Sequence, residues 1–149
     1  MIIAVARDGS PEGTAALLRA AQEADFQQAT LAVLHVRDGR DAADADPEPL
    51  RQQTRLLLAD AGLSHLHWDV HLADEGVDRA ETLVKLTEQL QADLLVLGCR
   101  RRTPIGKFLL GSTVQRVVLD APVPVLIVKA PVAAAKAVRP AAPRVPAGA

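Results

Sequence analysis

The segment from Asp93 to Lys129 constrains the fold of this chain more than any other part. It begins with consecutive apolar residues at 94–97, which run directly into a glycine. An uninterrupted apolar run of this kind is typical of a strand that is buried on both faces, as strands of a parallel sheet are. The segment therefore predicts a buried strand Leu94–Leu97, a loop from Gly98 to Gly111, a helix from Ser112 and a last strand from Val125.

The start of the predicted helix has the character of an anion site. Gly111, Ser112 and Thr113 stand directly before the apolar periodicity that begins at Val114. The first turn of a helix presents N–H groups without intrahelical partners and a partial positive charge, and both suit phosphate. Ligands of open α/β sheets bind at the carboxyl ends of the strands. We therefore expect an anion near Ser112, whose hydroxyl would be the helix N-cap alone or an N-cap that also contacts phosphate.

The rest of the chain alternates between short apolar runs and segments with helical periodicity. Further strands are predicted at Ile2–Ala6, Thr30–Val36 and Leu66–Leu72, and the strict alternation of the last one predicts a sheet edge. A helix is predicted from Pro11, after the N-cap Ser10, to about Ala24, with Ala15, Leu18 and Ala21 on one face. Two further helices are predicted, one from Pro47 to Gly62 and one of roughly 15 residues after Gly76. This order implies parallel crossovers, so we expect one doubly wound α/β domain with a five-stranded sheet and helices on both faces.

Length and composition are consistent with a single ordered domain. The chain has 149 residues, of which 49% are hydrophobic, and its single cysteine excludes an internal disulfide framework. A formal net charge of -1 gives no general electrostatic reason to bind nucleic acid or a membrane. Neither a signal-peptide pattern nor an apolar run of membrane-spanning length occurs, so we expect a cytoplasmic protein. Residues 130–149 are rich in alanine and proline and are predicted to form a disordered tail after a domain at 1–129.

The spacing of the loop is similar to that of a known family. Gly98, two residues, Arg101, nine residues and then Gly111-Ser112 resemble the G-x2-G-x9-G-[ST] nucleotide loop of the universal stress protein family, with arginine in place of the second glycine. The resemblance covers residues 1 to about 129 and includes Asp8-Gly9-Ser10 and His35-Val36. It implies parallel strands in the order 3-2-1-4-5 and dimerisation through the last strand.

The resemblance also implies that the ligand is an adenine nucleotide such as ATP, which could bind together with Mg²⁺. The implied contacts are Asp8 for the adenosine moiety, Val36 for the adenine, and Gly98, Gly111 and Ser112, with Thr113 next to them, for the phosphates. Arg101 departs from the family pattern, and we expect it at the same anion site because of its positive charge. The ends of the first and fourth strands enclose the point at which the strand order reverses, which is the usual ligand crevice of such a sheet. The resemblance therefore predicts an adenine-nucleotide-binding stress or regulatory protein, in which any ATP hydrolysis is slow and incidental.

Some residues have two interpretations. The Arg101 side chain could donate charge-assisted hydrogen bonds to a phosphate, or it could fill the space that a triphosphate needs. Asp8 could orient a ribose hydroxyl, or it could only form the turn before Gly9. His67 and His71 could hold a metal, but a polar strand face accounts for them without further assumption. The alternative function is a nucleotide-free, dimeric protein-interaction module of the same fold.

The last predicted strand gives an independent reason to expect a homodimer. Val125 to Val128 is an apolar run that should lie at an edge of the sheet and leave backbone N–H and C=O groups unpaired. Natural proteins rarely leave such an edge flat, apolar and uncovered. Two copies that meet edge to edge about a two-fold axis would pair these groups.

Overall fold

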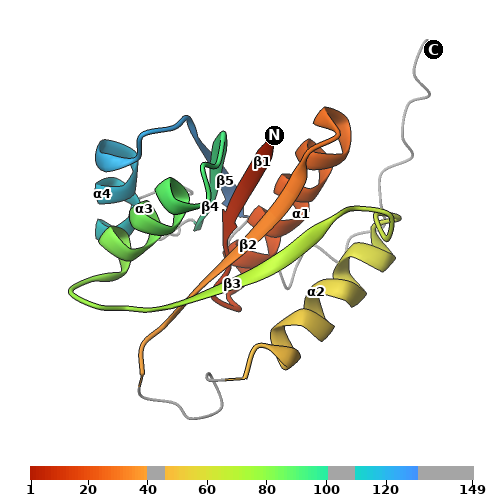
Figure 1. Ribbon diagram of the computed structural model, residues 1–149, viewed down its shortest axis with the longest axis horizontal. Helices are drawn as coiled ribbons and strands as arrows, with labels where there is room; N and C mark the ends of the chain where they lie inside the picture. The colour runs from red at the N-terminus through yellow and green to blue at the C-terminus, as the bar shows by residue number, and fades with distance from the viewer. Residues whose placement is uncertain (40–45, 101–109, 131–149) are drawn as a thin grey trace.

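A computed structural model describes residues 1–39, 46–100 and 110–130 of the chain. In this part of the chain five parallel strands alternate with four helices (Figure 1). The elements are β1 (Ile2–Ala6), α1 (Pro11–Gln27), β2 (Thr30–Arg37), α2 (Glu48–Asp60), β3 (Trp68–Asp74), α3 (Arg79–Gln89), β4 (Leu94–Arg100), α4 (Ser112–Asp120) and β5 (Val125–Ala130). The strand order is β3-β2-β1-β4-β5, which confirms the predicted doubly wound architecture.

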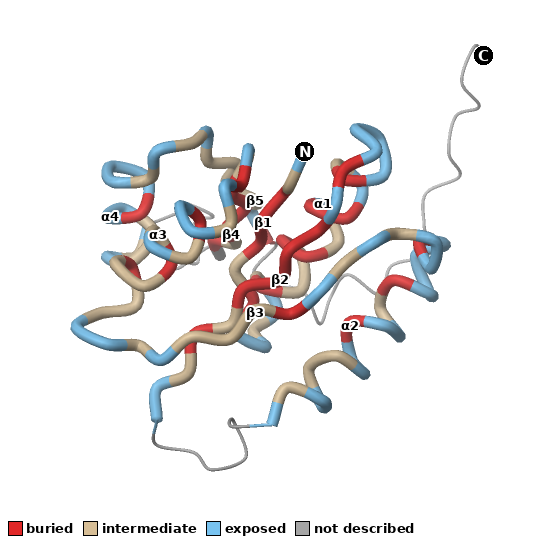
Figure 2. The backbone as a smooth tube through the Cα atoms, viewed as in Figure 1, coloured by how far each residue is buried: buried red, intermediate tan, exposed pale blue. Residues whose placement is uncertain are grey.

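The sheet lies between two layers of helices. Helices α1 and α2 cover one face and α3 and α4 cover the other (Figure 1). Alternate residues of β1 enter the two cores, Ile3 and Val5 toward α1 and Ala4 toward α3 and α4. Both cores are built from aliphatic side chains, and Figure 2 shows that β1 and β2 are buried along most of their length. The centre of the sheet therefore has no solvent-exposed face.

The strand order reverses between β1 and β4. β1 pairs with β2 on one side, where Ala6 lies opposite Leu34, and with β4 on the other, where Val5 lies opposite Val96. The carboxyl ends of β1, β2 and β4 therefore lie side by side at the same end of the sheet. The helices that follow β1 and β4, which are α1 and α4, begin at this point and lie on opposite faces of the sheet, and this leaves room for a ligand between them.

Several strand boundaries differ from the predictions, and β2 and β3 end one and two residues later than expected, at Arg37 and Asp74. β4 does not end at Leu97, because its residues 98–100 pair with residues 128–130 of β5. β5 accordingly runs to Ala130, which is one residue past the predicted end of the domain at 129. β3 begins at Trp68 and not at Leu66, since the Leu66 N–H bonds to the Leu63 carbonyl oxygen at 3.2 Å in a turn before the strand. The predicted edge position of β3 is confirmed.

The helix boundaries follow the capping signals. Ser10 caps α1 as predicted, since its hydroxyl accepts a hydrogen bond from the Gly13 N–H at 3.0 Å. α1 continues to Gln27, beyond the predicted end, before Gln28 takes a left-handed conformation with φ of 54°. α3 has 11 residues and is shorter than predicted, because Asp78 caps its start.

The predicted buried face of α1 is wrong. Ala15 and Leu18 are only half-buried, although Ala21 of the same predicted set is buried. The face that packs on the sheet consists of Gly13, Ala16, Leu17, Ala20, Ala21 and Ala24. This face is rotated by one residue from the predicted one.

Parts of the predictions lie outside the described residues. These parts are Arg101 with the rest of 101–109, and the proposed tail from 131 onward. Among the helices of the described residues, none has both the length and the apolar character needed to cross a membrane.

Candidate functional site

A cleft of about 480 Å³ opens at the carboxyl ends of β1, β2 and β4, at the reversal of strand order. The strands supply apolar side chains to it, and the N-terminal ends of α1, α3 and α4 supply polar groups. The apolar lining consists of Ala6, Leu34, Val36, Leu83, Leu97 and Val114. A cleft with an apolar floor and a few converging polar groups is the usual form of a small-molecule site.

Six of the predicted site residues border this one cleft, although they come from separate parts of the sequence. They are Asp8, Val36, Gly98, Gly111, Ser112 and Thr113. The seventh predicted residue, Arg101, lies outside the described residues. The structure brings the six together, and their contact with a ligand stays a prediction.

Asp8 is held in a turn and still presents an oxygen atom to the cleft. Its Oδ1 accepts hydrogen bonds from the Ser10 hydroxyl and from the Ser10 N–H, the latter at 3.0 Å. None of its hydrogen bonds with the described residues uses Oδ2. Burial opposes the ionisation of Asp8, but the hydrogen bonds from Ser10 and the positive charge of Arg79 outweigh it, so its pKa is lowered. Asp8 is therefore an ionised acceptor, and its turn-forming role leaves Oδ2 available to a ligand.

Gly13 was not predicted as a site residue, yet it permits this arrangement. A Cβ atom at position 13 would lie 2.7 Å from Asp8 Oδ1 and 3.2 Å from Ser10 Oγ. The Asp8 carboxylate therefore packs against α1 only because this position has no side chain. A glycine within a helix costs about 1 kcal/mol relative to alanine. Its occurrence in the first turn of a predicted helix was the signal that could have identified it.

Gly98 has a different role from the one that the loop spacing suggested. It lies inside β4, on the face toward α1, and not in the loop after the strand. A Cβ atom here would lie 2.1 Å from the Glu12 carbonyl oxygen and 2.5 Å from the Glu12 carbonyl carbon. The absence of a side chain at Gly98 therefore lets the backbone of α1 approach the floor of the cleft.

The N-terminus of α4 borders the cleft, but its N-cap is not Ser112. Gly111 occupies the N-cap position in an extended conformation and makes no side-chain cap, while Ser112 is the first helical residue. The first turn contains no acidic residue. Residues 112–114 of this turn line the cleft, and their N–H groups have no acceptor within the helix. This end of the cleft therefore has a positive potential from the backbone alone.

Arg7 is a second lining residue that the sequence analysis missed. It follows β1 directly and is only 5% exposed. Its Nη1 donates to Thr14 Oγ1 at 2.7 Å, while its buried Nε has no hydrogen-bond partner among the described residues. Burial lowers the pKa of Arg7, and the neighbouring Asp8 carboxylate partly offsets this effect. The Arg7 carbonyl oxygen accepts a hydrogen bond from His35 Nδ1 at 2.9 Å, which gives His35 a structural role.

Cys99, His67 and His71 contribute less to the site. Cys99 is buried at the end of β4 and lines the cleft, where it packs as a small side chain. His67 is exposed and lies just before the edge strand β3, and His71 is half-buried within that strand. Within the residues that the structure describes, no three His, Cys, Asp or Glu side chains are grouped so that they could hold a metal ion.

Comparisons with known proteins agree with this fold and with the loop spacing. The sequence profile of the universal stress protein family matches residues 1–129. A universal stress protein of Mycolicibacterium smegmatis is 34% identical over 138 residues, which cover 86% of this chain and 97% of that protein. The structure of a universal stress protein from Archaeoglobus fulgidus superposes with a TM-score of 0.71 at 27% identity, over 85% of this chain and 97% of that one.

A further solved structure shows a universal stress protein in complex with cAMP. It superposes with a TM-score of 0.67 at 25% identity and covers 87% of this chain and 97% of that one. The family profile covers residues 1–129, and the similarity to the mycobacterial protein extends over 86% of this chain. The chain belongs to the universal stress protein family.

Proposed function

We propose that this protein binds an adenine nucleotide, with ATP as the expected ligand, in the cleft and acts as a cytoplasmic stress or regulatory protein. The observation that supports this proposal most is the convergence of six family-type positions on one cleft that contains both an apolar floor and a helix N-terminus. The structural relative that was solved with cAMP supports a nucleotide of the same base. No step of catalysis is part of the proposal.

The lining suggests where the parts of the nucleotide would lie. Val36 and Leu83 form apolar surface for a purine base, and Asp8 Oδ2 is an acceptor for a ribose hydroxyl. The N–H groups at the start of α4 would receive the phosphates. The Mg²⁺ ion that accompanies ATP prefers oxygen ligands, and Asp8 and Glu12 are the acidic residues of the described lining.

Gly111→Val should weaken ATP binding at least ~10-fold, because a branched side chain at the N-cap of α4 would keep phosphate away from the first N–H groups. Titration calorimetry with ATP, ADP, AMP and cAMP measures this effect and ranks the ligands. Ala61→Val adds the same kind of bulk at an exposed position after α2 and should bind as the wild type does. If the wild type binds none of these nucleotides at millimolar concentration, the proposal is wrong and the nucleotide-free interaction module takes its place.

We also propose that the protein forms a homodimer through the open edge of β5. β5 is an outer strand, and Val125 to Val128 are all half-buried apolar residues. The Leu95 N–H bonds to the Pro124 carbonyl oxygen at 3.0 Å, so by the alternation of a parallel ladder Leu126 and Val128 bond to β4. The N–H groups of Val125 and Ile127 then point outward, where a second copy would pair with them.

Ile127→Pro should convert the dimer to a monomer without loss of the β4–β5 ladder, since proline removes only the outward N–H donor. Light scattering at micromolar concentration measures the mass, which is 15.8 kDa for the monomer. Ile127→Val keeps the donor and should remain dimeric. A wild-type protein of monomer mass would refute the dimer, and a dimer that survives the proline would place the interface elsewhere.

A further inference from the structure

Arg79 is a cation in the cleft wall that has no partner in the described structure. It is the first residue of α3, and it lines the cleft together with Leu83, which lies one turn later on the same helix face. Its side chain is half-buried. Arg79 makes no hydrogen bond or ion pair with any of the described residues. Its charge acts on Asp8 across the cleft, but the two do not form an ion pair.

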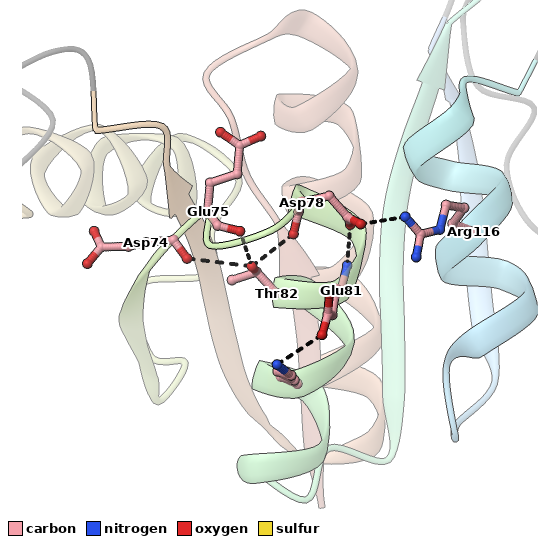
Figure 3. A network of polar contacts seen from close by, with 7 residues as sticks. Asp74, Glu75, Asp78, Glu81, Thr82 and Arg116 are labelled. Atoms are coloured by element: carbon pink, nitrogen blue, oxygen red, sulfur yellow. Dashed lines mark hydrogen bonds and ion pairs between the residues drawn. The ribbon is translucent and has the colours of Figure 1, made fainter.

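The carboxylates of Asp78 and Asp8 each make other hydrogen bonds. Asp78 precedes it, accepts a hydrogen bond from the Glu81 N–H at 2.8 Å and pairs with Arg116 of α4 (Figure 3). Asp8 uses its Oδ1 for Ser10. Arg79 therefore forms no ion pair within the described part of the chain, and its charge acts on Asp8 only at a distance.

The location of Arg79 is also electrostatically unfavourable for a cation. The N-terminus of a helix carries a partial positive charge, and a cation there is destabilising. The ion pair between Asp78 and Arg116 joins the start of α3 to α4. Arg116 lies four residues after Ser112, so this contact is about one helical turn from the N-terminus of α4. Arg79 and the positive end of α4 therefore flank the same part of the cleft. An anion between them would interact favourably with both.

We infer that Arg79 contacts a phosphate group of the nucleotide bound in the cleft, opposite the N-terminus of α4, and thereby sets a preference for nucleotides over nucleosides. The inference rests on the proposed nucleotide function and assigns to it a residue outside the Gly98 to Ser112 loop. A guanidinium group offers donors in a planar fork that matches phosphate oxygens. If Arg79 instead stacked on the base, it would contact adenosine and AMP alike.

The test compares adenosine, AMP and ATP by titration calorimetry with four proteins: the wild type, Arg79→Gln, Arg79→Lys and Arg55→Ala. Arg79→Gln should weaken AMP at least ~10-fold but change adenosine by less than ~2-fold, because only AMP carries the contacted group. Arg79→Lys keeps the charge without the fork and should be intermediate. Arg55 is an exposed arginine on α2 without a partner among the described residues, so its removal should leave all three affinities unchanged.

The outcomes separate this inference from the proposed function. Equal weakening of adenosine and AMP by Arg79→Gln would show a contact with the base and overturn the inference. Unchanged AMP affinity would show that Arg79 points to solvent, and this would overturn it as well. Either of these outcomes leaves the proposed nucleotide function intact. A wild-type protein that binds none of the three ligands would refute the inference about Arg79 and the proposed function together. Thermal unfolding of Arg79→Gln should match the wild type or exceed it slightly, since the variant removes a cation from a helix N-terminus.

Discussion

Gly98→Ala is expected to destabilise the protein by about 3 kcal/mol and to lower its Tm by about 10 °C. The added Cβ would lie 2.1 Å from the carbonyl oxygen of Glu12, which is far inside van der Waals contact. The obstructing atoms belong to the backbone of α1, so no side-chain rotation can relieve the overlap. Either α1 moves away from β4 or the strand bends, and both changes disturb the packed core. Denaturant and thermal unfolding measure the loss.

Gly62→Ala is the matched control for this substitution. Gly62 follows α2 with φ of 73°, and a Cβ atom there would meet nothing within 4 Å. Its replacement should cost only about 1 kcal/mol, from the left-handed backbone conformation. Gly98→Ala has no such conformational cost, so a larger loss at position 98 must come from steric overlap. Equal losses in the two variants would contradict the close approach of α1 to β4.

Leu17→Ala is the second substitution for which we expect a large effect, with a loss of about 3 kcal/mol. The Leu17 side chain is fully buried between α1 and the sheet, among Val5, Val33 and their neighbours. Its truncation would remove apolar contacts and leave a cavity in a region that consists of several helical alanines, which cannot expand to fill it. Chemical denaturation with an unchanged m-value would show that stability alone is affected.

Leu18→Ala removes the same atoms from the next residue, which is half-buried. It should cost about 1 kcal/mol, in proportion to the smaller area that it withdraws from water. The pair therefore tests which face of α1 packs on the sheet. A larger loss for Leu18→Ala than for Leu17→Ala would contradict the observed orientation of the helix.

The architecture could be predicted from the sequence because the strands are short apolar runs separated by strong capping signals. The run at 94–97 and the Ser10-Pro11 pair each have one plausible structural interpretation, and the structure agrees with both. The face of α1 could not be predicted in the same way. Apolar residues occupy nearly all positions from Ala15 to Ala21, so the helical period does not identify a single buried stripe.

The end of β4 was missed for a related reason. Gly98 was interpreted as a strand terminator, but pairing with β5 continues through it, and its lack of a side chain serves helix packing. The contribution of Arg79 to the cleft could not be predicted either. In the sequence, a single arginine at the start of a helix cannot be distinguished from a solvent-exposed side chain. Its position in the cleft follows only from the packing of α3 beside α4. Local patterns thus identified which segments meet at the cleft, while the contacts between segments required the three-dimensional structure.

The two edges of the sheet are unequal, and this inequality limits the assemblies that copies of the chain can build. The β3 edge carries charges: Asp69 lies 3.5 Å from Arg51, and Asp74 forms an ion pair with Arg37 at 2.9 Å. The β5 edge is apolar from Val125 to Val128. Head-to-tail addition of β3 to β5 would continue without limit and produce fibres. Because the charged edge disfavours that addition, a homodimer formed through β5 as proposed would leave no edge that favours further growth, and the sheet would be protected from open-ended polymerisation.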